Sequence, residues 1–168
     1  DQISMLKTDG YVAPIPVFSK REAAGFRHSL ETFEQSMTDE SREETMATLS
    51  KFKPHLLFTW LDKICHNETL LNAIEDLICP DLLIYSSAFF IKNSNDQAYV
   101  PWHQDSIYAD FNGGKQVRAW IAFTDSNTTN GCMRVIKGSH KKQFKHLDDP
   151  SDANNILFRK EKISENVD

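Results

Sequence analysis

A histidine and an aspartate that stand two residues apart, His103 and Asp105, are the side chains of this sequence best suited to bind a metal ion. The backbone around them is expected to be extended, because residues 98–100 favour strands and Pro101 disfavours a helix just before it. Residues i and i+2 of a strand project to the same face. An imidazole and a carboxylate side by side supply two adjacent metal ligands, and one further imidazole would complete the two-histidine, one-carboxylate arrangement of non-haem Fe(II) oxygenases.

The His-x-Asp pair alone is a weak signal, since it occurs by chance in many chains. His28, His55 and His66 fall on or beside expected helices without the spacing of a ligand set. We interpret these three as surface or helix-capping histidines. A third metal ligand must therefore come from elsewhere.

Two further motifs follow the pair. Trp120 lies in the segment RAWIAFTD, and residues 130–140 read NGCMRVIKGSH. Together with WHQD at residues 102–105, these motifs resemble the phytanoyl-CoA dioxygenase family of 2-oxoglutarate-dependent oxygenases, whose members combine a WHQD-like segment, an AW-x-A strand and an NGC-to-GSH segment at similar spacing. Fainter resemblance extends to DGYV at residues 9–12 and to Lys92, which lies where family members carry a lysine.

The resemblance implies an Fe(II)- and 2-oxoglutarate-dependent dioxygenase that uses O2 to hydroxylate a small-molecule substrate and converts 2-oxoglutarate to succinate. His103 and Asp105 would bind Fe(II). In the family, the third ligand is a distal histidine that follows the GSH segment by several strands and precedes an arginine for 2-oxoglutarate. Neither His140 nor His146 is therefore the expected ligand, and we expect the distal histidine and the last strands to lie outside this chain. Halogenating relatives replace the carboxylate by a small residue, so Asp105 favours hydroxylation.

Three more residues are candidates for binding the cofactor. Lys92 would bind a 2-oxoglutarate carboxylate, because an ammonium facing a core needs an anionic partner; the alternative is a solvent-facing lysine before the polar residues 93–96. Trp120 matches the family's AW-x-A tryptophan and would line the cofactor pocket, or it is a plain core residue. Gln104 falls on the opposite face of a regular strand, yet an irregular loop would allow a cofactor or substrate contact.

Two loops could determine the substrate. Residues 106–115 contain Tyr108, Phe111 and a Gly-Gly pair, which suit either a lid over the site or an ordinary connection. The chain's one basic cluster surrounds the GSH segment and would meet an anionic substrate or form a solvated loop. Its members are Lys137, Lys141, Lys142 and Lys145.

The predicted fold is α+β or mainly β: a double-stranded β-helix (jelly roll, cupin-like) with N-terminal helices packed on one sheet. Residues 1–18 are expected to end in a strand near Tyr11 and Val12, and residues 38–50 to form a solvated connection or exposed helix. One domain is expected over 1–168, with helical support at about 19–80 and jelly-roll strands at about 82–168.

Individual helices and strands can be predicted as well. Ser19 with Glu22 predicts a capping box that opens the first helix of this support, and Asn67 predicts the start of another. A further amphipathic helix is expected after Pro54, over residues 56–64. Strands are expected at residues 82–92, 97–105, 117–124 and 133–136.

Composition narrows the classes of function. The chain has 168 residues, 40% hydrophobic and 26% charged, with a net charge of −5, which suits a globular domain and disfavours nucleic-acid binding. Three scattered cysteines indicate a reducing compartment, and we expect a cytoplasmic protein without a membrane partner. A second hypothesis is a non-catalytic jelly-roll binding domain that keeps the His-x-Asp motif. A hydrolase is disfavoured because GxSxG, P-loop and HExxH motifs do not occur.

Overall fold

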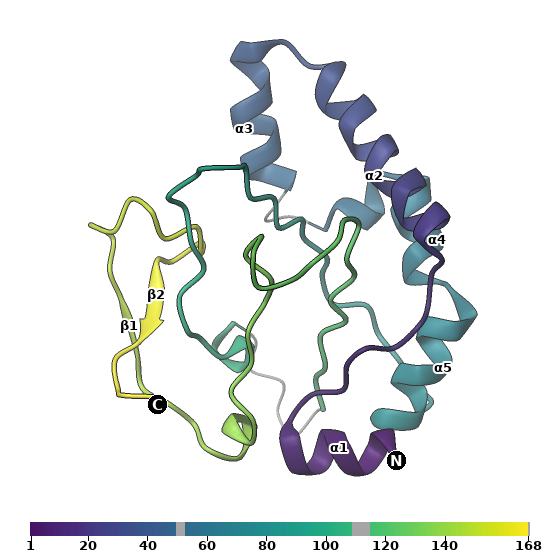
Figure 1. Ribbon diagram of the computed structural model, residues 1–168, viewed down its shortest axis with the longest axis vertical. Coiled ribbons are helices and arrows are strands. Elements are labelled where there is room, and N and C mark those ends of the chain that lie inside the picture. The colour runs from purple at the N-terminus through teal and green to yellow at the C-terminus, as the bar shows by residue number, and fades with distance from the viewer. Residues whose placement is uncertain (50–52, 109–114, 168) are drawn as a thin grey trace. The chain divides into compact units, whose positions relative to one another are not determined.

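The computed structural model describes residues 1–49, 53–108 and 115–167 (Figure 1). The chain folds into two compact units. The unit that we call the helical unit consists of Ala13–Phe89 and Val117–Arg134. The other, which we call the motif unit, consists of Asp1–Val12, Phe90–Gln116 and Val135–Asp168 and contains His103 and Asp105. Both units are assembled from separate stretches of the chain, and the single domain over 1–168 stays a prediction. No helix in the described ranges is long and apolar enough to cross a membrane.

The capping box predicted at Ser19 is confirmed. Ser19 is the N-cap of α2 (Lys20–Gln35), its hydroxyl accepts a hydrogen bond from the Glu22 backbone N–H at 3.2 Å, and Glu22 accepts from the Ser19 backbone N–H at 2.8 Å. These reciprocal bonds satisfy backbone donors that a helix start leaves without partners. The Ser19 hydroxyl also donates to the Glu22 carboxylate at 2.6 Å, and this bond, followed by that from the Ser19 backbone N–H, lowers the pKa of the Glu22 carboxyl because both favour its charged form.

Three more α-helices belong to the helical unit: α3 (Asp39–Leu49), α4 (Thr59–Cys65) and α5 (Glu68–Leu77). Helix α5 begins where predicted, with the Asn67 side chain accepting from the Leu70 backbone N–H at 3.0 Å. Helix α3 confirms a helix rather than an irregular connection within residues 38–50, but Leu49 at its end is buried, only 4% exposed.

The helix predicted over residues 56–64 is wrong in its first turn. Pro54–Leu56 form a short 3-10 helix (η1), and α4 begins only after Phe58, whose backbone is extended. Because of this break, Leu56 and Leu57 are 71% and 67% exposed instead of lying on the apolar face.

A cluster of half-buried aromatic rings packs together in the helical unit. The Trp60 ring centroid lies 6.0–6.3 Å from those of Phe26, Phe89 and Phe123, and the Phe26 and Phe123 centroids are 5.7 Å apart. Such distances allow favourable ring–ring contact in addition to the burial of apolar area. Phe123 comes from the second stretch of this unit, so the aromatic cluster joins the helices to residues 117–134.

Among the described residues, the predicted strands do not pair into a jelly roll. The assigned sheet consists of two antiparallel strands, β1 (His146–Asp148) and β2 (Glu161–Ile163), with Leu147 opposite Lys162. Residues 82–92, 117–124 and 133–136 carry no strand, although their composition favours one. Strand propensity is effective only with a partner to pair with and a face to bury, which explains why these segments are not strands among the described residues.

The predicted strand at residues 97–105 is the partial exception. Tyr99 forms an isolated parallel bridge with Asn155, and the Ile163 N–H donates to the Trp102 carbonyl at 2.9 Å. The backbone just before His103 is therefore held against β2, although it is not assigned as a strand.

The N-terminal segment differs from its prediction. Residues 2–9 form helix α1 (Gln2–Asp9), and no strand occurs at Tyr11 or Val12. The helix begins at Asp1, whose carboxylate accepts from the Ser4 backbone N–H at 2.7 Å, and ends at Gly10 with φ 86°. A local cap and a left-handed glycine define this helix. It has no strong apolar stripe, and an apolar stripe is the pattern from which helices were predicted.

His55 is buried, whereas the sequence was interpreted as placing it either on the surface or at a helix cap. Only 6% of the residue is exposed, its Nδ1 lies 2.6 Å from the Ser87 hydroxyl, and its backbone N–H donates to the same hydroxyl at 3.2 Å. Burial lowers the pKa of His55 below its usual 6.5, and the nearby Lys53 charge lowers it further. His66, by contrast, caps α4 and contacts Asp62 at 3.1 Å, as a capping histidine should.

We expect acid to destabilise the protein through His55. Because its pKa is lower in the folded state, the unfolded chain binds the proton more readily, so this contribution to stability is present above pH 6.5 and is lost as the pH falls through the folded-state value. Thermal melting between about pH 7.5 and 5.5 measures the loss. His55→Asn should flatten the pH dependence, whereas His28→Asn, at an exposed histidine, should preserve it. An identical slope in both variants would contradict the assignment.

Candidate functional site

The His103 ring is held in one orientation by its own backbone. Its Nδ1 lies 2.9 Å from the Pro101 carbonyl oxygen, and because a carbonyl can only accept, Nδ1 carries the hydrogen. In the neutral imidazole, Nε2 then carries the lone pair. This nitrogen lies 3.3 Å from Oδ1 of Asp105, and the two side chains are 16% and 28% exposed.

Asp105 approaches His103 through a turn rather than along a strand. It begins a 3-10 helix, η2 (Asp105–Ile107), and its carbonyl accepts from the Tyr108 N–H at 3.0 Å. The strand alternation expected from the sequence is thus replaced by an extended Gln104 followed by a tight turn. The prediction that the two side chains lie together is nevertheless met at the atoms that would bind a metal.

The geometry of the pair fits two adjacent ligands of one metal ion. Two ligand atoms about 2.1 Å from an octahedral ion and at right angles lie about 3.0 Å apart, close to the 3.3 Å between Nε2 and Oδ1. A neutral imidazole nitrogen and a carboxylate oxygen are ligands that Fe(II) accepts. Within the described residues, no group of three or more His, Cys, Asp or Glu is arranged to hold a metal ion.

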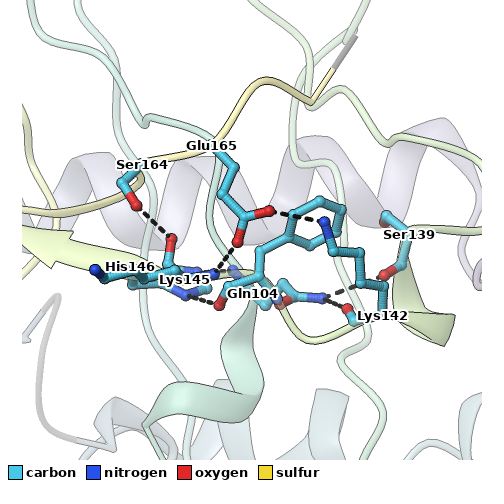
Figure 2. Close-up of polar contacts among 8 residues, drawn as sticks. Gln104, Ser139, Lys142, Lys145, His146, Ser164 and Glu165 are labelled. Atoms are coloured by element: carbon cyan, nitrogen blue, oxygen red, sulfur yellow. Dashed lines mark hydrogen bonds and ion pairs between the residues drawn. The ribbon is translucent and has the colours of Figure 1, made fainter.

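Gln104 lies between His103 and Asp105 in the sequence and anchors the segment 139–146 (Figure 2). Its side-chain amide donates to the backbone carbonyls of Ser139 and Lys142 at 3.2 and 2.8 Å, and its carbonyl oxygen accepts from the Phe144 N–H at 2.9 Å. One amide side chain thereby satisfies three backbone groups of a segment far along the chain. The role of Gln104 in binding the cofactor stays a prediction.

His146 uses both ring nitrogens in the same arrangement. Its Nε2 accepts from the Gln104 backbone N–H at 2.9 Å, and its Nδ1 donates to the Phe144 carbonyl at 3.0 Å (Figure 2). Because both lone-pair and N–H positions are engaged, His146 acts here as a structural residue on β1.

His140 faces helix α1. Its Nε2 lies 3.2 Å from the Lys7 carbonyl, and its ring packs so closely on Gly10 that a Cβ there would lie 2.3 Å from Nδ1. The Gly138 N–H donates to the Asp9 carbonyl at 2.8 Å. The GSH motif at 138–140 therefore holds the end of α1, which explains how DGYV and GSH come together.

The comparison with known families covers nearly the whole chain. The family model described as phytanoyl-CoA dioxygenase (PhyH) matches residues 6–166. The chain belongs to the phytanoyl-CoA dioxygenase family. The resemblance first drawn from residues 102–105, Trp120 and 130–140 is thereby confirmed.

Curated relatives in this family are distant. An ectoine dioxygenase from Bordetella bronchiseptica is 25% identical over 151 residues, which cover 84% of this chain and 49% of the relative. A phytanoyl-CoA dioxygenase domain-containing protein 1 homolog from Dictyostelium discoideum is 33% identical over 96 residues, covering 53% of the chain and 34% of the relative. The matched part of the chain thus spans about half the length of the ectoine dioxygenase and about a third of the Dictyostelium protein. No solved structure matches significantly.

The two other candidate cofactor residues of this family member are Lys92 and Trp120. Lys92 is exposed and precedes a turn in which the Asp96 N–H donates to the Asn93 carbonyl at 3.2 Å. Trp120 belongs to the helical unit and is 42% exposed, so it is not the plain core tryptophan that was the alternative. Their roles toward 2-oxoglutarate stay predictions.

Two lysines of the basic cluster already have carboxylate partners. Lys142 pairs with Glu165 at 2.7 Å, and Lys137 pairs with Asp9 at 3.0 Å. The hydrogen bond from Lys142, followed by that from the Lys145 backbone N–H, lowers the pKa of Glu165 (Figure 2). These ion pairs support the solvated-loop alternative for Lys137 and Lys142. The cluster's role toward a substrate stays a prediction.

The loop after Asp105 is described only in part. The lid predicted over residues 106–115 falls mainly on residues 109–114, including Phe111, which lie outside the described residues. Its first aromatic residue, Tyr108, lies beside the pair: its ring centroid is 6.3 Å from that of His103, with the rings at 69°. Tyr108 was expected from the sequence to belong to the lid, not to lie beside His103 and Asp105.

Proposed function

We propose that the protein is a non-haem Fe(II)- and 2-oxoglutarate-dependent dioxygenase that hydroxylates a small molecule and converts 2-oxoglutarate to succinate. The observation that carries the proposal is the His103–Asp105 pair, in which Nε2 and Oδ1 lie 3.3 Å apart and the hydrogen of His103 is held on Nδ1. Family membership supports the same chemistry. We also propose a cytoplasmic location.

Each residue of the pair has a distinct role in this proposal. His103 binds Fe(II) through the lone pair of Nε2, and the Pro101 carbonyl fixes the tautomer and the ring plane, as outer partners of ligating histidines do. Asp105 binds through Oδ1 and contributes the negative charge. When bound, Fe(II) supplies open coordination positions for the keto acid and O2, and thus the oxidising chemistry. We propose that a further histidine is the third protein ligand and completes the two-histidine, one-carboxylate set.

The substrate is proposed only as a class. Two of the similar curated proteins are ectoine dioxygenases, from Bordetella bronchiseptica and Bordetella parapertussis, at 25% and 24% identity. Since one scaffold supports many chemistries, these names support a small-molecule substrate without selecting ectoine itself. Lys92 and Trp120 remain the proposed contacts to 2-oxoglutarate.

The test is an anaerobic titration of the full-length protein with Fe(II) and 2-oxoglutarate. Chelation of the keto acid to iron produces a weak visible charge-transfer band, and we expect this band to saturate with 2-oxoglutarate in the wild-type protein. Succinate, which lacks the keto group, is the matched control and should give no band. Absence of the band in protein shown by circular dichroism to be folded would contradict the proposal.

That negative result would favour the second candidate, a non-catalytic binding domain. The observation behind this alternative is that the described residues provide two grouped metal ligands rather than three. A site with two protein ligands holds iron more weakly than a three-ligand site. The band titration therefore separates the two candidates directly.

A further inference from the structure

Tyr108 carries a hydroxyl group whose oxygen is buried and has no hydrogen-bond partner among the described residues. A tyrosine O–H removed from water normally finds a partner, because an unsatisfied buried donor costs free energy. Buried polar groups without partners in a folded protein call for a specific explanation, such as a bound ligand. For Tyr108 the surroundings indicate where such a ligand binds.

The η2 turn brings Tyr108 to the side of Asp105. The two residues are three apart, and the Tyr108 N–H donates to the Asp105 carbonyl at 3.0 Å. In a 3-10 helix, side chains at i and i+3 eclipse one another. The Tyr108 side chain therefore projects to the same side of the turn as the carboxylate that faces His103.

The contact with His103 gives independent support for this placement. The two ring centroids are 6.3 Å apart with an interplanar angle of 69°, an edge-on arrangement. Tyr108 is thus in contact with one residue of the pair and eclipsed with the other. Its phenol is a neutral donor beside the place where an anionic ligand of the metal would bind, and hydrogen bonds to ionised acceptors are the stronger kind.

We propose that the Tyr108 hydroxyl donates a hydrogen bond to an oxygen of the 2-oxo acid bound at the His103–Asp105 pair. The inference rests on the proposed function, which places the keto acid on the metal. The 2-oxo acid is favoured over the substrate because, in the proposed function, it would itself be a ligand of the metal held by His103 and Asp105. Tyr108 is then a binding residue of the site rather than only part of a lid.

The test compares two hydroxyl deletions in one unit, Tyr108→Phe and Tyr99→Phe. The Tyr99 hydroxyl donates to the Asp152 carboxylate, so it has a structural partner that the Tyr108 hydroxyl does not have within the described part of the chain. Without ligands, Tyr108→Phe should leave the melting temperature unchanged or raise it, whereas Tyr99→Phe should lower it. This first measurement requires no metal and no activity.

The second measurement is the dissociation constant of 2-oxoglutarate, obtained anaerobically from the charge-transfer band with saturating Fe(II). Tyr108→Phe should weaken 2-oxoglutarate binding by about tenfold to a hundredfold, the usual effect of one hydrogen bond to a charged group. Tyr99→Phe should bind 2-oxoglutarate as the wild type does. Fe(II) affinity without the keto acid should be the same in all three proteins.

Two results would overturn the inference while leaving the proposed function intact. One is a wild-type band with unchanged 2-oxoglutarate affinity in Tyr108→Phe. The other is a fall in melting temperature for Tyr108→Phe as large as that for Tyr99→Phe, which would reveal a structural partner. If the folded wild type gives no band at all, the proposed function fails and the inference fails with it.

Discussion

Replacing Asp105 by alanine is expected to abolish the charge-transfer band and to weaken Fe(II) binding by about a hundredfold or more, since outer partners of metal ligands alone cost ten- to a hundredfold. Oδ1 of Asp105 lies 3.3 Å from Nε2 of His103 and provides the negative charge of the pair. Without it, a single imidazole remains at this place, and a divalent ion loses both an adjacent ligand and charge compensation. Isothermal titration with Fe(II) under argon measures the affinity, and the visible band reports the keto-acid complex.

Asp148→Ala is the matched control. Asp148 is another carboxylate of the motif unit, on β1, where it binds Arg159 at 3.0 Å in an exposed ion pair. Exposed pairs contribute about 0–1 kcal/mol to stability, so this variant should keep both the fold and the band. A band of normal intensity in Asp105→Ala would show that Asp105 is not a metal ligand. Equal loss in Asp148→Ala would indicate unfolding instead.

Local signals in the sequence were reliable in the helical unit. Ser19 with Glu22 and Asn67 each identify a helix start from residues within three positions, and the capping bonds form as predicted. These bonds depend only on neighbours in the chain, which the sequence displays directly. The missed break at Phe58 shows the limit, because Leu56 and Leu57 fit an apolar stripe that the backbone does not continue.

Signals that depend on distant partners were less reliable. Residues 82–92 and 117–124 have strand-like composition, yet the structure assigns them no strand in the described residues. A strand exists only through hydrogen bonds to another segment, and composition does not identify that segment. For the same reason the anchoring role of Gln104 could not be predicted, because its three side-chain partners lie 35 or more positions later in the chain.

The candidate site was predicted in part, since one of its contacts followed from the sequence and another did not. The proximity of His103 and Asp105 followed from their spacing, although a turn produces it instead of a strand. Tyr108 was not grouped with them, because a spacing of three from Asp105 places side chains together in a 3-10 turn but not in a strand. The spacing of His103 and Asp105 suggested an Fe(II) site, whereas the expectation of 2-oxoglutarate came only from the resemblance to the family.

Replacing Gln104 by alanine is expected to destabilise the protein by about 2–4 kcal/mol, because it removes three hydrogen bonds worth about 1 kcal/mol each and leaves partly buried backbone groups without partners. For a chain of 168 residues this corresponds to a fall in melting temperature of roughly 5–15 °C. The segment 139–146 then loses its three hydrogen bonds to the Gln104 side chain and keeps the one from the Gln104 backbone N–H to His146. Because Gln104 stands between the two proposed ligands, Fe(II) affinity should fall by about ten- to a hundredfold.

Gln143→Ala provides a control of the same residue type in the same segment. Gln143 is exposed and accepts one hydrogen bond, from the Ser106 hydroxyl at 3.3 Å, so its loss should change the melting temperature by no more than about 2 °C. Gln104→Glu separates the two kinds of contact, since a carboxylate still accepts from the Phe144 N–H but cannot donate to the Ser139 and Lys142 carbonyls. It should therefore be destabilised nearly as much as Gln104→Ala. Melting temperatures that are equal for the Gln104 and Gln143 variants would contradict an anchoring role for Gln104, whereas destabilisation with unchanged Fe(II) affinity would confine that role to the fold.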